Sequence, residues 1–388
     1  MLTLSFSEAL STFEPIAWFL SSAPIFIYTI RQNPKSRWWL LPLNVLSSIQ
    51  SYRTVNQLST HLPGLDWLLA FTSLINVIHA TSALYLEAWT IPARPLGAHP
   101  RWDTIMAFKA WMNPRRLHLR CNCEPGSSPA TALQRLFFVA KRLALLAVLA
   151  ALYLGIELGI LFWLKPGPRD FAEPHQKYFH WRADREAAFR AVFAFHWAWL
   201  TYLILTVAHA ALAVFFVGIL QIDEPDEWPL LYGNPLAAYT VQRFWGTFWH
   251  SLGTRPQICH GRVITRKLLG LEAGSTAEKI LLACWVFAVS GCIHALVTWK
   301  TEAEGDPLSD VWFLMLNFLA GLVELLIRRQ GLLSGLGRRK TVLRRMAGYL
   351  CIVLLFYCIV PPYQFPVLHK AALRRLPFKV NMNINRRA

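Results

Sequence analysis

The chain has 388 residues, of which 55% are hydrophobic and 16% charged, and its formal net charge is +17. This balance is typical of a polytopic membrane protein and argues against a soluble globular fold. The basic residues lie between apolar stretches, which indicates loops beside anionic lipid headgroups and argues against nucleic-acid binding. The seven cysteines lack the spacing of a zinc site or a disulfide framework. No bound metal or redox cofactor is therefore expected.

Eight apolar stretches follow one another along the chain, and a helix needs roughly 20 apolar residues to cross a bilayer. They fall near Phe13–Ile30, Trp38–Ser51, Trp67–Leu86, Leu143–Leu164, Phe193–Leu220, Ile280–Trp299, Val311–Ile327 and Met346–Val360. The second and last are short, so they also suit tilted, re-entrant or interfacial segments. The sequence predicts an all-α, polytopic transmembrane helical bundle of about eight spans, forming one membrane-embedded domain over residues 1–388.

Basic side chains gather in the loops after the first, third and seventh stretches, whereas the loop after the sixth is acidic. Because cytosolic loops carry the excess of Lys and Arg, we expect these three loops and the long segment Gln221–Lys279 on the cytosolic side. Both chain ends then lie in the lumen, which disagrees with the basic C-terminal tail. Either one short stretch does not cross, or the tail escapes the rule.

The segment Gln221–Lys279 begins with an acidic cluster and continues into a predicted interfacial helix. Asp223, Glu224, Asp226 and Glu227 surround a proline, and we interpret them as a solvated turn in preference to a metal site. Asn234 followed by Pro235 is typical of an N-cap and a first helical residue. The sequence thus predicts a helix from about Leu236 to His250.

Aromatic and polar side chains separate on this predicted helix. Phe244 and Phe248 are four residues apart, as are Trp245 and Trp249, and such rings suit the headgroup boundary. A second face carries Arg243, Gly246, Thr247 and His250. Taken alone, this pattern favours an aromatic-anchored interfacial helix whose histidine faces water.

His294 lies inside the apolar stretch Ile280–Trp299. An ionisable side chain at membrane depth is costly, so it marks a functional site by default. Ser290, Gly291 and Thr298 are its helical neighbours, and the two hydroxyl groups are placed to orient the ring. Burial disfavours the imidazolium ion, and a neutral imidazole accepts a proton from an alcohol as a general base. A structural histidine, hydrogen-bonded between helices, is an equally open interpretation.

Asn317 and Glu324 share the stretch Val311–Ile327, where a spacing of seven residues puts them on one helix face. A carboxylate inside a membrane normally needs a partner. Glu324 is therefore expected either to pair with Arg328, one turn further on, or to line a substrate cavity.

The residues around the two histidines resemble the fungal wax-synthase-like branch of the membrane-bound O-acyltransferase superfamily. That branch has a Phe-Trp-x-x-x-Trp-His motif, and then a Phe-x-x-Ser-Gly-x-x-His motif on a membrane helix. The first motif is matched by Phe244, Trp245, Trp249 and His250, and the second by Phe287, Ser290, Gly291 and His294. The chain departs from the family pattern at Leu230, Tyr232 and Gly246–Phe248. Residues 221–360 are thus the part that bears the motifs.

The resemblance implies transfer of an acyl group from acyl-CoA to an alcohol in an endoplasmic-reticulum-type membrane, with membrane lipids around the enzyme. Members make wax esters or acetylate secondary metabolites such as terpenoids, and we favour the second activity. We expect His294 to act as the general base and His250 to polarise the thioester carbonyl. The expected substrate-binding residues are Arg243, Trp245, Trp249, Ser290, Asn317 and Glu324.

Two non-enzymatic interpretations compete with this one. A proton-coupled transporter also has many spans and membrane histidines, but it is expected to show internal repeats, and the sequence has none. A non-catalytic membrane scaffold is the second alternative. A thioester assay separates both from an acyltransferase.

Overall fold

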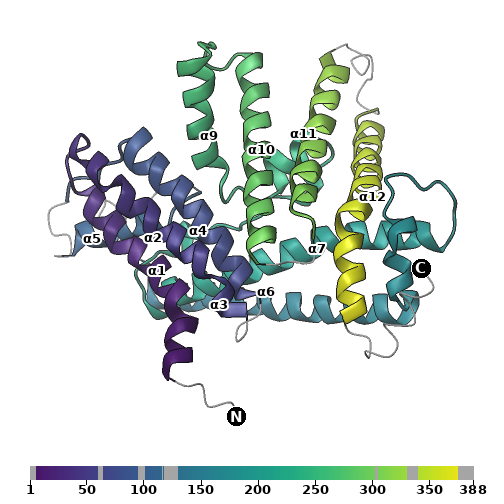
Figure 1. Cartoon of the computed structure of the whole chain (residues 1–388), viewed down its shortest axis with the longest axis horizontal. Helices are drawn as coiled ribbons and strands as arrows, with labels where there is room; N and C mark the ends of the chain where they lie inside the picture. Colours follow the sequence, from purple (N-terminus) through teal and green to yellow (C-terminus); the bar gives the residue numbers. More distant parts are fainter. Residues whose placement is uncertain are drawn as a thin grey trace. The chain divides into compact units, whose positions relative to one another are not determined.

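The computed structural model describes residues 6–59, 64–94, 101–115, 117, 130–301, 305–329 and 340–374, which form helices and loops without a strand (Figure 1). Seven helices within these ranges are long and apolar enough to cross a membrane. They are Ser11–Ile30, Leu65–Leu86, Ala132–Leu164, Arg185–Ile219, Thr276–Lys300, Pro307–Arg329 and Val342–Arg374. The prediction of an all-α polytopic bundle is confirmed, and the chain is an integral membrane protein.

The second and last apolar stretches differ from the other predicted spans. Trp38–Ser51 becomes a 3-10 turn and the helix α2, Leu41–Thr54, whose 14 residues extend only about 21 Å. It buries four polar side chains, Asn44, Ser47, Ser48 and Ser51, so its inner face is polar. The last stretch is longer than expected, because it lies within α12, Lys340–Arg374, a helix that continues through three prolines. The basic tail beyond Arg374 lies outside the described residues.

The chain divides into two compact units, and the first comprises residues 1–131, 222–228 and 251–302. Its helices are α1 (Phe6–Ile30), α2, α3 (Asn56–Ser59), α4 (Leu65–Thr81), α5 (Trp102–Trp111), α9 (Thr254–Arg262) and α10 (Thr276–Lys300). Helix α2 packs against α1 and α4, and α10 packs against α4 and α9 (Figure 1). A cluster containing Val55, Leu58, Ala70 and Val297 joins α10 to the N-terminal helices.

The acidic turn at residues 223–227 is buried in the first unit, so the interpretation as a solvated turn is wrong for most of it. Lys109 Nζ lies 3.2 Å from Asp223 and 2.6 Å from Glu227, and Glu224 is also buried. Burial raises the pKa of the Glu227 carboxyl, and the neighbouring Lys109 ammonium opposes that rise. A cation distant in the sequence therefore draws these carboxylates inward.

The second unit comprises residues 132–221, 229–250 and 303–388. Its helices are α6 (Ala132–Gly159), α7 (Arg185–Ala213), α8 (Val241–Arg243), α11 (Pro307–Arg329) and α12. Single π-helical turns extend α6 to Leu164 and α7 to Ile219. Helix α7 packs along α12, where Phe171, Phe189, Phe193 and Phe365 form a buried aromatic cluster.

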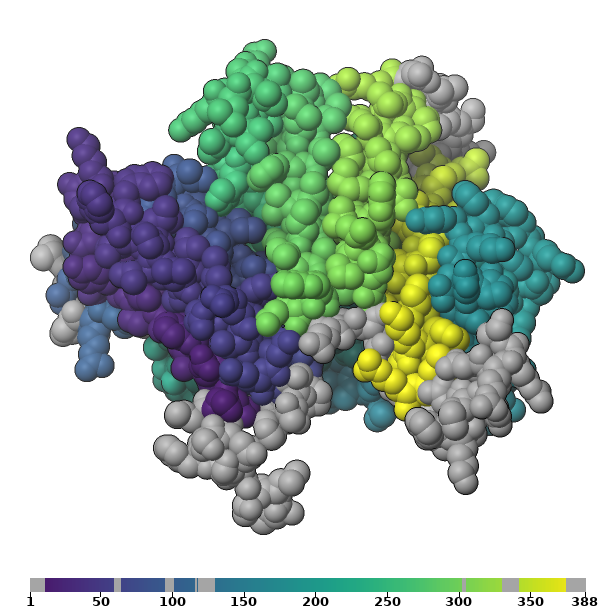
Figure 2. All heavy atoms as spheres, viewed as in Figure 1, coloured from purple at the N-terminus to yellow at the C-terminus, as the bar shows by residue number. Residues whose placement is uncertain are grey.

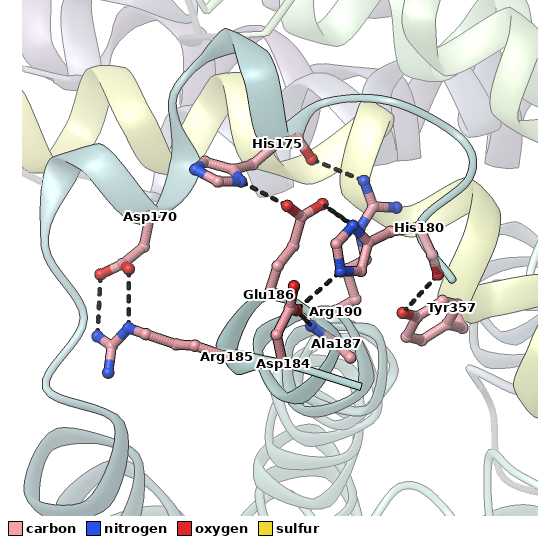
Figure 3. Close-up of polar contacts among 9 residues, drawn as sticks. All are labelled: Asp170, His175, His180, Asp184, Arg185, Glu186, Ala187, Arg190 and Tyr357. Atoms are coloured by element: carbon pink, nitrogen blue, oxygen red, sulfur yellow. Dashed lines mark hydrogen bonds and ion pairs between the residues drawn. The ribbon is translucent and has the colours of Figure 1, made fainter. Parts of the chain in front are cut away.

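A polar network fixes the start of α7 (Figure 3). Asp184 is the N-cap, since its side chain accepts from the backbone N–H of Ala187, and His180 Nε2 donates to the same carboxylate at 2.7 Å. Glu186 accepts from His175 Nδ1 at 2.7 Å and from Arg190 Nε at 2.8 Å. The Arg190 side chain is fully buried. The capping bond and the ion pairs together set the point at which α7 begins.

Candidate active site

His294 lies on α10, in the first unit, and its imidazole is half-buried. The helix begins where the Ser275 hydroxyl caps it by accepting from the Glu278 N–H. The ring packs edge-on against Phe71 of α4, with ring centroids 4.6 Å apart at an interplanar angle of 70°. Among the described residues, none forms a hydrogen bond with either ring nitrogen of His294. The arrangement favours an imidazole open to a substrate over a histidine that joins two helices.

Ser290, one turn before His294, does not orient the imidazole ring as predicted. Its hydroxyl donates to Gln257 Oε1 on α9, at 3.3 Å. On the same side of α10, Trp285 Nε1 donates to the Gln257 carbonyl at 3.0 Å. The serine therefore fastens α9 to α10, which was not foreseen because Gln257 lies 33 residues away in the sequence.

The helix predicted from Leu236 to His250 is wrong, because two separate caps divide this segment. Asn234 caps only the short 3-10 turn Pro235–Ala237, accepting from Leu236 N–H at 2.9 Å. Thr240 then caps α8 by accepting from the Arg243 N–H at 3.0 Å. A π-helical turn, Phe244–Phe248, follows, and Trp249 is already extended. Side-chain capping at both polar residues competes with a continuous helix.

The aromatic rings of this segment pack inward. Trp249 is buried and stacks on Phe244 at 5.1 Å and on Trp197 of α7 at 5.7 Å. The predicted four-residue pairs do touch, because Trp245 and Trp249 rings lie 5.4 Å apart, as do those of Phe244 and Phe248. Phe244 and Trp249 were expected to lie at the headgroup boundary, but they are part of the second unit's core.

His250 follows this aromatic cluster and is half-buried. Tyr232 meets its ring edge-on at 5.6 Å, and the Tyr232 hydroxyl donates to the Thr201 carbonyl at 3.3 Å. Burial raises the pKa of the Tyr232 phenol, so this group stays protonated and is not a base. The next residue must be glycine, since a Cβ on Gly233 would come within 2.1 Å of the Thr247 carbonyl oxygen. The close approach of Gly233 to the Thr247 backbone thus holds Tyr232 beside His250.

Asn317 and Glu324 both reach from α11 to the motif segment. Asn317 is fully buried, and its Oδ1 accepts from Trp245 Nε1 at 3.1 Å. Glu324 accepts from the Gln242 backbone N–H at 3.2 Å and from Arg328 at 2.5 Å. The predicted pairing of Glu324 with Arg328 is confirmed, and both polar residues connect α11 to the tryptophan motif.

Arg243 is exposed, and its guanidinium lies over the Tyr239 ring at 4.7 Å. Arg345 of α12 lies over the same ring at 5.2 Å. Two cations against one aromatic ring give this part of the second unit a local positive charge. That charge suits the anionic phosphates expected of an acyl-CoA.

The predicted site residues divide between the two units. Ser290 and His294 lie in the first, whereas the second contains Arg243, Trp245, Trp249, His250, Asn317 and Glu324. The pairing of His250 with His294 stays a prediction, as does the single domain over residues 1–388. Sequence reasoning missed Phe71, Tyr232 and Gln257. For Gln257 a signal existed, because Gln257 and Gly261 are four residues apart, a spacing that puts both on one face of a helix.

Comparison with known proteins agrees with the motifs. The chain is 29% identical over 187 residues to acetyltransferase eriL of Hericium erinaceus, which covers 46% of this chain and 44% of that protein. It is 38% identical over 93 residues to acetyltransferase ataH of Aspergillus terreus, covering 24% and 30%. With acetyltransferase atnC of an Arthrinium species it shares 27% over 238 residues, covering 58% and 53%.

These alignments span about half, or less, of the length of the curated relatives. No solved structure matches the chain. The Membrane bound O-acyl transferase family matches residues 228–316. The segment that holds both His250 and His294 is therefore the one shared with membrane bound O-acyl transferases, which confirms the resemblance predicted from its motifs.

Proposed function

We propose that this protein is an acyl-CoA-dependent O-acyltransferase of the endoplasmic reticulum membrane. It transfers an acetyl group from acetyl-CoA to a hydroxyl of a lipophilic secondary metabolite, such as a terpenoid. The observation that carries the proposal is His294, an imidazole inside an apolar span, within the matched segment, with neither ring nitrogen hydrogen-bonded among the described residues. The three relatives described above are all named acetyltransferases, which favours acetyl over a long acyl chain.

In the proposed reaction, His294 takes the proton of the acceptor hydroxyl while the hydroxyl oxygen attacks the thioester carbon. The tetrahedral intermediate then expels the CoA thiolate, which takes the proton back from the imidazolium. One ester and one thiol are formed, and the histidine returns to its neutral form. Direct attack needs no acyl-enzyme, in keeping with the lack of a recognisable serine or cysteine nucleophile motif in the sequence.

Residues of the second unit complete the proposal. His250 polarises the thioester carbonyl, and Tyr232 fixes the angle of its ring. Arg243 attracts the phosphates of CoA, for which its exposed position over Tyr239 is suitable. Trp245 lines the path of the apolar acceptor and the buried Trp249 packs behind it, while Asn317 and Glu324 hold that segment to α11.

The test is a transfer assay on membranes that contain the full chain. Radiolabelled acetyl-CoA and palmitoyl-CoA are each supplied with hydroxylated sesquiterpenes, hydroxylated diterpenes or hexadecanol, and the esters are separated and counted. The proposal expects acetyl esters of a terpenoid alcohol. Palmitoyl esters of hexadecanol would instead indicate a wax-ester synthase. Thioester turnover equal to that of membranes lacking the protein would contradict any acyltransferase activity.

A further inference from the structure

Two arginine side chains of the second unit converge on the ring of Tyr239. The Arg243 guanidinium lies 4.7 Å from the ring centroid, and the Arg345 guanidinium lies 5.2 Å from it. Both distances are within the range of cation–π attraction, and both arginine side chains are exposed. More than 100 residues separate the two arginines in the sequence, so only folding makes them neighbours.

Helix α12 holds Tyr239 at this position. A Cβ on Gly348 would overlap the Tyr239 carbonyl oxygen, so a glycine is needed where α12 meets this backbone. The Tyr349 hydroxyl donates to the Leu236 carbonyl at 2.6 Å, and the Tyr349 ring meets Tyr239 edge-on at 6.3 Å. In the space-filling view the first turns of α12, in yellow-green, lie at the surface beside α11 (Figure 2). The arginine pair is thus accessible and has a fixed support.

Neither guanidinium has an acidic partner among the residues that the structure describes. Glu324 is the carboxylate that reaches this segment, and it already accepts from the Gln242 N–H and from Arg328. An arginine side chain stays charged at physiological pH, and neighbouring like charges repel each other. The pair therefore leaves an excess of positive charge that an anion would neutralise.

Both arginines belong to segments that are predicted to lie on the cytosolic side. Arg243 is part of the segment Gln221–Lys279, and Arg345 follows the seventh apolar stretch, whose loop is basic. Within the second unit, these two segments meet at Tyr239, in agreement with a common side of the membrane. A water-soluble anion from the cytosol therefore has access to both guanidinium groups.

The charge of the pair fits a phosphate monoester better than a phosphate diester. A monoester carries about −1.5 to −2 charges at neutral pH, which matches two guanidinium groups, whereas a diester carries a single charge. Each guanidinium also presents a planar fork of N–H donors that matches two phosphate oxygens. Acetyl-CoA carries one phosphate monoester, on the 3′ position of its ribose, far from the thioester.

We infer that Arg243 and Arg345 together bind the 3′-phosphate of acetyl-CoA beside the Tyr239 ring. This inference rests on the proposed function, which requires a CoA thioester as the acyl donor, and it adds Arg345 and Tyr239 to the residues that bind the donor. The ring holds both cations in place before the donor arrives. A preoriented pair loses less conformational freedom on binding than two unrestrained side chains, which strengthens the site.

The experiment compares acetyl-CoA with acetyl-dephospho-CoA, which lacks only the 3′-phosphate, in the acetyl-transfer assay. For the unaltered protein we expect a KM about 10- to 100-fold higher for the analogue, as for the loss of hydrogen bonds between charged groups. Arg243→Gln and Arg345→Gln should each lower this KM ratio, and the double variant should bring it close to one. The change is expected in the KM for acetyl-CoA, because the 3′-phosphate takes no part in the reaction.

Arg344→Gln is the matched control. Arg344 is exposed and precedes Arg345 on α12, but it makes no cation–π contact with Tyr239 among the described residues. The variant removes the same charge from the same turn, so it should keep the KM ratio of the unaltered protein. An equal fall of the ratio in Arg344→Gln would show that overall positive charge attracts the donor, and the inference would be wrong. Size-exclusion profiles in detergent establish that each variant is folded.

Phosphatidate is a second source of a phosphate monoester, since its headgroup lies at the membrane surface. Retention of labelled phosphatidate by the solubilised full chain is therefore compared between the unaltered protein and the double variant. The inference expects equal retention. A loss of retention in the double variant, together with an unchanged KM ratio, would make the lipid headgroup the occupant and contradict the inference.

The inference and the proposed function fail in different ways. If the unaltered protein uses both thioesters with the same KM, the 3′-phosphate is not recognised and the inference is wrong, while acetyl transfer stands. If it turns over no thioester, the proposed function fails. Binding of labelled CoA, competed by unlabelled CoA or dephospho-CoA, then tests the arginine pair directly. A preference for CoA that the double variant loses supports the phosphate site, and equal competition contradicts it.

Discussion

The histidine of α10 and the histidines at the start of α7 differ in whether their ring nitrogens have polar partners. His175 and His180 each contact a carboxylate, Glu186 and Asp184 respectively, at 2.7 Å (Figure 3). Among the described residues, His294 has no hydrogen bond or ion pair, and its aromatic contact is with the ring of Phe71. An imidazole with satisfied nitrogens stabilises a structure, whereas one left open inside apolar surroundings keeps its chemistry for a ligand. The comparison identifies which histidine is the better candidate for catalysis.

The largest expected effect comes from removing the open imidazole. His294→Ala should lower acetyl transfer by about 10²–10⁴-fold, the usual loss when a general base is removed. Stability should change little, because no hydrogen bond among the described residues is lost. The measurement is turnover per mole of folded protein, with the apparent melting temperature in detergent recorded beside it.

His175→Asn is the matched control for that variant. It removes an imidazole that donates to Glu186, so it should lower stability by about 1–2 kcal/mol and leave turnover per folded molecule unchanged. The comparison is broken if the two variants exchange their effects, with His175→Asn inactive and His294→Ala active.

Arg190 tests whether the network is structural. Its guanidinium is fully buried. It donates one hydrogen bond to Glu186 and a second to the His175 carbonyl, at 3.0 Å. Arg190→Met leaves the Glu186 carboxylate and two histidines without that cation, so we expect a loss of about 3 kcal/mol in the free energy of unfolding. Chemical unfolding in detergent gives the value. A loss of activity without a loss of stability would assign the network to the reaction instead.

The hydrogen bond between Trp245 and Asn317 tests how much a satisfied polar group within the tryptophan motif contributes to stability. Trp245→Phe removes the indole N–H and leaves the Oδ1 of a fully buried asparagine unsatisfied, at a cost of about 1–3 kcal/mol. Thermal melting should show this loss. Asn317→Leu, combined with Trp245→Phe, removes both polar partners and should recover part of it. If the double variant is no more stable than the single one, the hydrogen bond is not what holds this contact.

The smallest expected effect concerns pH. Burial alone would raise the pKa of the Asp184 carboxyl, but hydrogen bonds from His180 and from the Ala187 N–H hold it below the ordinary value. Because the folded pKa is the lower one, the carboxylate stabilises the fold above about pH 4 and loses this contribution as the pH falls through the folded pKa. The stability difference between the unaltered protein and Asp184→Asn should therefore shrink from pH 6 to pH 3. A constant difference would contradict this linkage.

Much of the fold follows from local features of the sequence. The lengths of the apolar stretches predict the spanning helices, because a bilayer requires a fixed length of apolar helix. The spacing within Phe244–His250 predicts which rings touch, and Glu324 and Arg328 pair as residues one turn apart do. The two histidine motifs predict the family whose model matches residues 228–316.

Other features required the tertiary structure, because their cause lies far away in the chain. Lys109 forms an ion pair with the acidic turn, more than 100 residues away in the sequence. The Ser290 hydroxyl donates to Gln257 and not to His294. The caps at Asn234 and Thr240 divide a segment whose period alone predicts a continuous helix. The sequence by itself determined the membrane class, the existence of the long apolar helices and the two motif histidines, since these depend on local composition and period. Only the tertiary structure decided which polar groups are satisfied and which stay open, because each hydrogen bond depends on a partner that folding brings from elsewhere.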